Sequence, residues 1–317
     1  MKLQVLSGKK GYTLLALDGL RWETERKGSP GKLTFDYIDD GKFKIEEGNV
    51  VRLSVDKKKL FFGYVFKITR DKSNKVSILC YDQMRYLKNK DTYIFNDTTS
   101  TKIIKAICKD YGIKTGTIVD TKFNIKSVIY EGKTLLDIMQ DSLEMTLTNT
   151  KKLYVLYDAY GKLTVQKASK MIVPLLIDAE TAQAYSYDSS IDEETYNRIV
   201  LEHKDSKTEA KTYWTAEDKK TQKKWGTLQY FEKISETETA QNKANTLLKL
   251  YNTKTKHLTI TDAIGDLRIR AGSTILVNLK IGKEKVKKLM VVDSCTHIFN
   301  ENEHWMTLKV IGGGFIA

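Results

Sequence analysis

The stretch GNVVRLSVDKKKLFFGYVFKITRDKSNKVSILCYD, from Gly48 to Asp82, decides the fold class because its apolar residues alternate with polar ones. In its first segment, every second position is apolar: Val51, Leu53 and Val55. This period of two is typical of a β-strand with one buried face. A Lys-rich turn, a long strand, a polar tip at residues 71–74 and a return strand follow. The stretch therefore predicts a strand and a long β-hairpin.

A degraded copy of this pattern begins at Gly272 as GSTILVNLK and continues, after a Lys-rich turn, as KLMVVDSCTHIFNENEHWMTLKVIGG. Its first strand again alternates, and residues 300–303 form its polar tip. The offset of 224 residues from Gly48 is far beyond the ~20–50 residue period of solenoid repeats. The sequence therefore predicts two β-domains of the same topology, separated by other elements.

Length and composition set the number of domains. A chain of 317 residues is long enough for two or three domains of roughly 100–200 residues. There are only two prolines and no long Gly/Ser tract, so we expect the domains to abut.

The start of the chain lacks the apolar run of a secretory signal, and no stretch approaches the ~20 apolar residues of a membrane span. Three scattered cysteines without a CxxC motif predict reduced, buried thiols made in a cytoplasm.

The net charge of +13 suggests an acidic partner, but the lysines cluster in turns. Three such runs are residues 56–59, 219–224 and 282–288. Basic turns of this kind are typical of solvated strand tips that discourage edge aggregation. A nucleic-acid binder more often concentrates its basic residues on one face or between stacking aromatics. Contact with a polyanion remains the alternative interpretation.

Residues 1–90 are predicted to form the first β-barrel. The Pro-Gly turn of KGSPG, residues 27–31, lies between two predicted strands at 21–26 and 32–37. Residues 91–175 are predicted to form a small α+β domain. A helix capped by Thr99 or Ser100 ends at Gly112, a second helix follows GKT at 132–134, and 153–165 reads as a hairpin.

Residues 176–317 are predicted to form a second β-barrel with two additions. One is a Lys-rich hairpin excursion at about 209–230, and the other is a helix at about 236–252 that begins with the capping-box pair Ser235 and Glu238. We expect this helix to plug one end of the barrel or to pack on its wall. The predicted fold class is thus mainly β with α+β elements.

The best candidate for chemistry is a trio near the C-terminus: Cys295, His297 and His304. If the last turn is at 300–303, both histidines lie on one face of the hairpin. A thiolate or metal site is one interpretation. Strand packing is the other, and it is more typical because a nucleophilic cysteine normally lies at a helix N-terminus or beside an orienting group.

Other catalytic signatures are missing from the sequence. There is no GxSxG and no Walker GxxxxGK[ST] motif, and Gly312–Gly314 has no following helix. Acidic clusters occur at 46–47, 192–194 and 236–238, but glycosidase chemistry needs two carboxylates on opposed walls of a cleft. Such clusters are more typical of solvated turns and helix N-termini. The sequence therefore predicts no enzyme and no catalytic, cofactor or metal residues.

The segments RKGSPGKLTF, EEGNVVRLSVDKKKLFFGYVF and YDQMRYLKNKDTYIF, followed in order by IYEGKTLLDIM, YVLYDAYGKLTV and NRIVL, resemble a known family. They are similar to the XkdQ-type tail proteins of phages, prophages and phage-tail-like bacteriocins, which are related to late control protein D and the baseplate hub. The resemblance covers essentially the whole chain. It implies two similar β-barrels per subunit, and a ring of three subunits whose six barrels continue the tail tube and receive the spike.

The resemblance also implies partners and a location. A homotrimer in the assembled particle would contact the tail tube protein, the central spike protein and other baseplate or tape-measure components. The isolated subunit would stay monomeric if ring closure needs the tube or spike as template. The protein would be made in the bacterial cytoplasm without a signal peptide and would reside in the tail baseplate, without cofactor, membrane span or specific nucleic acid.

Two other classes stay open. A cell-wall hydrolase at the tail tip would need a convergent acid/base pair. A nucleic-acid-binding barrel would use Phe62, Tyr64 and Phe66 to stack bases, although three apolar residues on one strand face are more typical of a core.

The last hairpin has apolar groups on both faces. We expect one face to include Val291, Cys295 and Phe299 and the opposite face to include Val292 and Ile298. In the return strand, Trp305 opposes Met306. A barrel in water needs only its inner face apolar, so we expect neighbouring subunits to cover the outer one.

Overall fold

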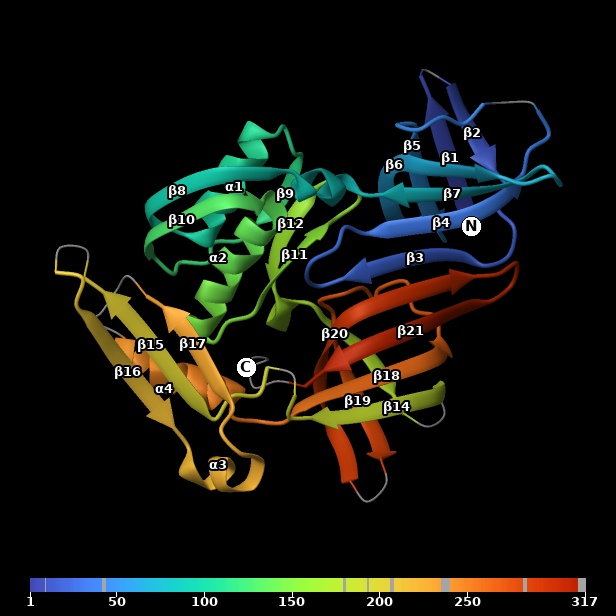
Figure 1. Cartoon of the computed structure of the whole chain (residues 1–317). Coiled ribbons are helices and arrows are strands. Elements are labelled where there is room, and N and C mark those ends of the chain that lie inside the picture. The colour runs from blue at the N-terminus through green and yellow to red at the C-terminus, as the bar shows by residue number, and fades with distance from the viewer. Residues whose placement is uncertain are drawn as a thin grey trace.

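The computed structural model describes residues 1–8, 10–41, 44–178, 181–192, 194–205, 208–234, 240–281 and 284–312 of the chain. Strands predominate and a few helices lie between them (Figure 1). The predicted class, mainly β with α+β elements, is confirmed. Among these residues, no helix is both long and apolar enough to cross a membrane.

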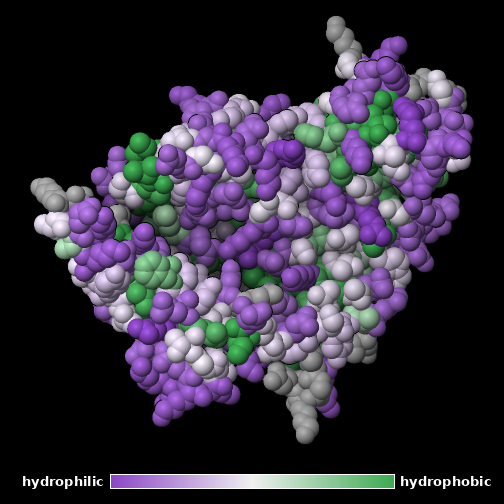
Figure 2. Space-filling model, viewed as in Figure 1, coloured by the Kyte–Doolittle hydropathy of each residue, from purple (hydrophilic) through white to green (hydrophobic). Residues whose placement is uncertain are grey.

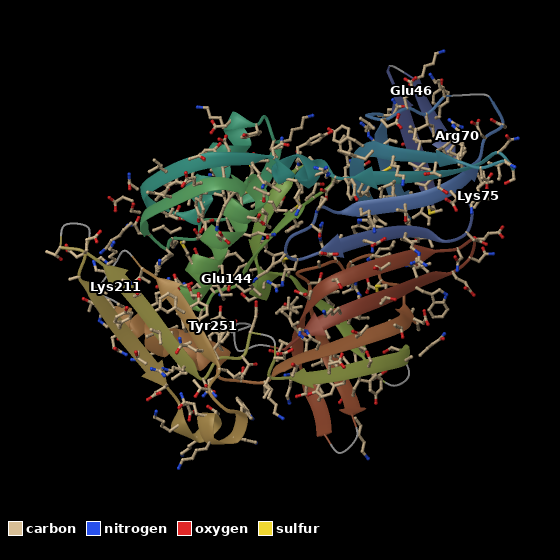
Figure 3. All side chains as sticks on the ribbon, in the orientation of Figure 1. Glu46, Arg70, Lys75, Glu144, Lys211 and Tyr251 are labelled. Carbon is tan, nitrogen blue, oxygen red and sulfur yellow. The ribbon has the colours of Figure 1, made fainter. Side chains whose placement is uncertain are left out.

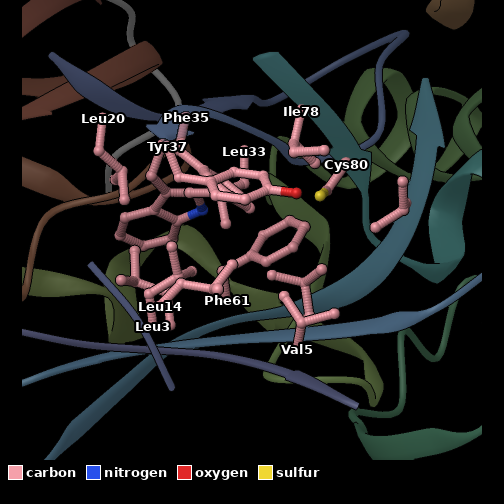
Figure 4. Close-up of a cluster of buried hydrophobic side chains, with 14 of the residues drawn as sticks. Leu3, Val5, Leu14, Leu20, Leu33, Phe35, Tyr37, Phe61, Ile78 and Cys80 are labelled. Atoms are coloured by element: carbon pink, nitrogen blue, oxygen red, sulfur yellow. The ribbon is translucent and has the colours of Figure 1, made fainter. Parts of the chain in front are cut away.

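The N-terminal β-unit consists of seven strands that surround one apolar core. Its strands are β1 (Lys2–Ser7), β2 (Lys10–Leu14), β3 (Leu20–Glu25), β4 (Lys32–Ile38), β5 (Val50–Val55), β6 (Lys58–Arg70) and β7 (Lys75–Tyr81). Alternate residues point inward, so that Leu33, Phe35 and Tyr37 of β4 are buried as predicted. Figure 4 shows these side chains interdigitating with residues from β1, β3, β6 and β7. Burial of this face is the main stabilising term of the unit.

The middle unit packs two helices against two small sheets. It contains η1 (Gln83–Lys88), β8 (Lys90–Thr98), α1 (Ser100–Asp110), β9 (Thr115–Ile118), β10 (Ile125–Thr134), α2 (Leu135–Thr150), β11 (Tyr154–Asp158) and β12 (Leu163–Lys167). The hydroxyl of Thr99 accepts a bond from Lys102 N, and that of Thr134 accepts one from Asp137 N. These caps satisfy amides that a helix start leaves unpaired. The two predicted helices and the hairpin of β11 with β12 are confirmed.

The C-terminal β-unit starts with β13 and β14 and resumes after an insertion. Its strands are β13 (Ile172–Ile177), β14 (Ala182–Ser190), β18 (Thr255–Ile264), β19 (Thr274–Ile281), β20 (Glu284–Phe299) and β21 (His304–Ile311). Strand β20 pairs with β3, so the two β-units share one 13-stranded sheet within the described residues. Figure 1 shows this sheet as a wall that runs from β7 through β4, β3, β20, β21 and β18 to β14.

The order of five strands is the same in both β-units. In the N-terminal unit the order is β5-β6-β7-β4-β3, and in the C-terminal unit it is β19-β20-β21-β18-β14. The chain visits these strands in the same sequence, except that the insertion lies between β14 and β18 where the first unit has the KGSPG turn. The units differ outside these five strands, since β1 is antiparallel to β5 whereas β13 is parallel to β19.

The inserted unit corrects two predictions. It contains β15 (Arg198–Lys204), β16 (Lys211–Glu217), α3 (Lys219–Trp225), β17 (Gln229–Lys233) and α4 (Ala240–Tyr251). The hairpin predicted at about 209–230 is wrong, because a helix separates β16 from β17 and both strands flank β15. The helix predicted to plug or coat the barrel instead covers β15 and β16 and approaches α2. Its proposed capping box lies outside the described residues.

Two β-bulges change which side chains face the core. The bulge in β6 is at Phe66 and that in β20 is at Asp293. Each bulge reverses the alternation that follows it. As a result, Val292, Cys295 and Phe299 all point into the core, and the predicted division of β20 into two faces is wrong.

The outer face of β20 is covered within the chain at one predicted position. Val291 packs on a cluster of the same chain, formed by Leu147, Leu153, Val155 and Ala168. A neighbouring subunit is therefore not needed to cover this residue.

Phe62, Tyr64 and Phe66 lie on the outer side of β6 instead of in its core, which corrects another prediction. The ring of Phe62 meets Tyr160 of the middle unit at 5.7 Å, and Tyr64 meets Tyr86 of η1 at the same distance. These edge contacts join the N-terminal β-unit to the middle unit.

Candidate assembly surface

The pairing of β3 with β20 makes one surface from the two β-units. Six antiparallel pairs run from Ser294↔Glu25 to Phe299↔Leu20. Just beyond the Ser294↔Glu25 pair, the Arg26 amide donates to the Asp293 carbonyl at 2.9 Å. The Arg26 guanidinium also pairs with the Asp293 carboxylate at 2.8 Å. Backbone bonds reinforced by a partly buried ion pair hold the two units in a fixed register.

A stack of aromatic rings lies on the core side of this junction. His297 stacks on Trp22 of β3 with ring centroids 4.8 Å apart, and on His304 at 5.1 Å. Phe299 stacks on His304 at 4.4 Å. The stack crosses from one β-unit to the other, so that it supports the sheet pairing with side-chain contacts.

The trio predicted from sequence does come together. His297 Nδ1 lies 2.8 Å from His304 Nε2, and His297 Nε2 lies 2.9 Å from the Ile269 carbonyl and 3.2 Å from Cys295 Sγ. Burial lowers the pKa of His297 to about 3, and burial also raises the pKa of the Cys295 thiol. A neutral imidazole and a protonated thiol are poor starting points for nucleophilic chemistry.

The same geometry does not form a metal site. Within the described part of the chain, no group of three or more His, Cys, Asp or Glu side chains is arranged to hold a metal ion. Both nitrogens of His297 already lie within hydrogen-bond distance of protein atoms. The trio therefore packs as a hydrogen-bonded part of the junction.

A second buried network joins all three larger units, and sequence reasoning missed it. Asp82, at the end of β7, accepts from the Gly31 and Met84 amides at 2.8 and 2.9 Å. Gln83 donates to the Asp158 carboxylate at 2.7 Å, and Arg270 of the C-terminal β-unit donates to the Asp158 carbonyl at 2.8 Å. Two carboxyls and one guanidinium thus meet where the units touch.

Burial controls the ionisation of this network. The pKa of Asp82 is raised well above its ordinary value by burial and then by the nearby Asp158 carboxyl. The pKa of Asp158 is likewise raised by burial, and that of Arg270 is lowered by burial. Buried polar groups of this kind are costly unless they are bonded, so they fix one arrangement of the units. The sequence signal was present, since Asp82 directly follows strand β7 and Asp158 is the last residue of strand β11.

The outward face of the shared sheet is polar. On β3, β4 and β7 it carries ion pairs between neighbouring strands: Lys32 with Glu23 and Lys75 with Asp36, both at 2.8 Å. Figure 3 places Lys75 and Arg70 at the tip of the β6–β7 hairpin. Cross-strand pairs of opposite charge favour one register of a sheet. This face is hydrophilic and its charges are largely compensated on these strands.

A hollow of about 770 Å³ lies where the units converge, and Figure 2 shows it near the middle of the viewed face. Glu144 of α2 and Tyr251 of α4 border it (Figure 3). Lys27 pairs with Glu144 across it at 2.7 Å. Charges of both signs line the hollow, so it does not select one class of ion by charge alone.

The acidic clusters of the sequence do not assemble into an opposed pair in the part that the structure describes. Glu46 pairs with the nearby Lys44 at 2.6 Å. Residues 193, 236–238 and 313–314 lie outside the described residues. Glu194 borders the hollow described above.

Comparison with known families identifies the chain. A model of the YQBQ-like family matches residues 20–311. The chain belongs to the YQBQ-like family. It is 31% identical over 304 residues to the phage-like element PBSX protein XkdQ of Bacillus subtilis (strain 168), covering 94% of this chain and 91% of that protein. It is 30% identical to YqbQ of the same strain, with the same coverage. The resemblance predicted from the ordered segments is confirmed.

Solved structures share the fold of this YQBQ-like chain. A tail protein from Neisseria meningitidis MC58 superposes with a TM-score of 0.75 at 12% identity, covering 99% of this chain and 97% of that one. The 43 kDa tail protein of prophage MuSo2 from Shewanella oneidensis gives 0.70 at 16% identity and full coverage of both chains. At 12–16% identity, these two matches show a shared fold over the whole chain.

Proposed function

We propose that this YQBQ-like chain is a baseplate hub subunit of a phage tail or phage-tail-like particle, and that three copies form a ring joining the tail tube to the central spike. The observation that carries the proposal is the repeated strand order, β5-β6-β7-β4-β3 and β19-β20-β21-β18-β14. Three chains with two similar units each would present six similar surfaces to a sixfold tube. Because the two units of one chain are similar but not identical, the ring itself would have threefold symmetry, which matches a trimeric spike.

Further support comes from the junctions inside the chain. The β3–β20 pairing, the stack around His297 and the network of Asp82, Asp158 and Arg270 all act between units. Buried interactions of this kind suit a part that transmits force along a tail without changing shape. We place the protein in the tail baseplate, assembled in the bacterial cytoplasm with tube, spike and other baseplate or tape-measure components.

The proposal also holds that the protein has no catalytic activity of its own. The carboxyls with raised pKa, Asp82 and Asp158, are buried and each accepts a backbone amide, so they do not face a cleft. Turnover of purified peptidoglycan by the pure protein, lost when one carboxylate is changed, would contradict this part of the proposal.

Co-expression with the tube and spike proteins of the same tail, followed by native mass determination and electron microscopy, tests the hub. We expect a ring-shaped complex with three copies of this chain. The isolated protein is expected to be monomeric, since the entropy lost when three copies associate is offset only by the additional contacts with the tube and spike proteins. Failure to bind either partner, together with tight salt-dependent binding to DNA, would overturn the proposal.

A further inference from the structure

The β3–β20 pairing depends on the different lengths of neighbouring strands. Strand β19 pairs with residues 284–291 of β20, and β3 occupies the same side of β20 from Ser294 to Phe299. Strand β21 pairs along the opposite side, from Val291 onward. The second half of β20 thus offers a free edge beyond the end of β19, and the edge strand of the other β-unit fills it.

The N-terminal unit has the same local construction around β6. Gly48 and Gly272 both have a left-handed φ, of 85° and 89°. Their amides donate to the carbonyls of Val65 and Val292 at 2.8 and 2.7 Å. In each long strand the bulge is the next residue after that valine: Phe66 follows Val65, and Asp293 follows Val292. Matching glycines and matching bulges fix a residue-by-residue correspondence in which Thr69 of β6 stands where Thr296 stands in β20.

The second half of β6 has an unpaired edge. Strand β5 pairs with β6 only as far as Tyr64, and in the described residues the stretch from Lys67 to Arg70 pairs with β7 alone. Lys67, Thr69 and Arg70 are exposed. This edge corresponds to the edge of β20 that β3 occupies.

The strand that corresponds to β3 is also free on one side. In strand order β14 takes the place of β3, and among the described residues β14 pairs only with β18. Figure 1 shows β14 as the outermost strand of the wall. Pairings through β4 and β18 place Asp188 of β14 where Glu23 stands in β3, and Tyr187 where Trp22 stands.

We propose that β14 of one copy pairs antiparallel with residues 67–70 of β6 of the next copy, by the geometry that joins β3 to β20 within the chain. Thr69 then faces Asp188, and Arg70 faces Tyr187. This inference rests on the proposed ring and adds the surface that closes it. Three copies of the eight strands from β6 to β14 would make one continuous wall.

The side chains at this predicted junction are complementary. On the outward face, Lys67 lies diagonal to Asp188, which places opposite charges within reach of each other. On the core side, Arg70 stands opposite Tyr187, as His297 stands opposite Trp22 in the internal junction. The Arg70 guanidinium pairs with Asp39 of its own chain, and a guanidinium over an aromatic face is attractive. The contact is head-to-tail, which is the kind of contact that a closed ring of three copies requires, and it does not pair two identical edges.

Disulfide trapping tests the register. Paired residues in an antiparallel ladder have Cα atoms ~4.5–5.5 Å apart, within the ~4.4–6.8 Å that a disulfide spans. We expect the Thr69→Cys/Asp188→Cys chain, oxidised in complex with the tube and spike proteins, to give covalent trimer. A slipped pair, Thr69→Cys with Ser186→Cys, is displaced by ~7 Å along the strand and should give about tenfold less.

Two controls complete the design. The Glu23→Cys/Thr296→Cys chain should form the equivalent bond within one chain and stay monomeric, because these residues are paired in the internal junction. Mixing Thr69→Cys protein with Asp188→Cys protein should give heterodimers, whereas each variant alone should not cross-link. The native cysteines Cys80, Cys108 and Cys295 are buried and add little background.

The outcomes separate this inference from the proposed function. A three-copy complex that cross-links at the slipped pair, or at neither pair, overturns the β14–β6 junction and leaves the hub standing. Absence of any three-copy complex, together with absence of cross-links, overturns both.

Discussion

The corresponding glycines Gly48 and Gly272 allow a matched test of backbone strain against packing. Alanine at either position must adopt a left-handed φ, which costs roughly 1–2 kcal/mol. A methyl group at Gly48 would meet nothing within 4 Å. A methyl group at Gly272 would lie 2.4 Å from Val155 Cγ1, at the contact between the C-terminal β-unit and the middle unit.

The expected magnitudes differ because Val155 cannot move aside. It is buried in β11, and a β-branched side chain has one favoured rotamer. Overpacking a core costs about 1–3 kcal/mol, so Gly272→Ala should destabilise by roughly 2–5 kcal/mol and Gly48→Ala by roughly 1–2 kcal/mol. At about 2 °C per kcal/mol, the first thermal transition should fall by roughly 4–10 °C and 2–4 °C respectively.

Thermal unfolding followed by circular dichroism measures both shifts. The double variant Gly272→Ala/Val155→Ala removes the clash. Its free energy of unfolding should therefore lie below that of Val155→Ala by the backbone strain alone, roughly 1–2 kcal/mol. Equal shifts for the two single variants, or no coupling in the double variant, would refute the reasoning from packing.

Two further predictions use buried ionisable groups, and a third uses the partly buried ring of Phe62. Because the pKa of His297 is lowered to about 3, the native protein should lose stability as pH falls from about 6.5 towards 3, and His297→Phe should flatten this dependence in urea titrations at several pH values. The pKa of Asp82 is raised in the folded protein, so as pH rises this carboxyl ionises first in the unfolded chain and the free energy of unfolding should fall above about pH 4. Asp82→Asn should remove this pH dependence, which would appear as a smaller difference between the urea midpoints at pH 4 and pH 7. Phe62→Ala should weaken docking of the middle unit by about 1–2 kcal/mol, detected as faster amide exchange near Tyr160.

The sequence predicts the local part of the fold well. Alternation over Leu33, Phe35 and Tyr37, and the capped starts at Thr99 and Thr134, depend only on neighbouring residues. The repeat is legible for the same reason, because each copy is a strand and a hairpin of adjacent segments.

What sequence reasoning missed depends on contacts between distant segments. The face of Phe62 is set by contact with Tyr160, about a hundred residues away, and the alternation of β20 is reversed by a single bulge at Asp293. Helix α3 has no buried residue and therefore no apolar period to reveal it. The network of Asp82 and Arg270 exists only once three units have met.

The pairing of β3 with β20 also has a consequence for synthesis. The ion pair that closes it joins Arg26 to Asp293, 267 residues apart. At the ~5–20 residues per second of translation, the edge of β3 waits roughly 15–50 s on the ribosome for its partner strand. During this interval nascent chains on one messenger expose identical unpaired edges to each other. The polar outer face of β3, with Arg21, Glu23 and Glu25, would then serve to keep these half-made chains apart.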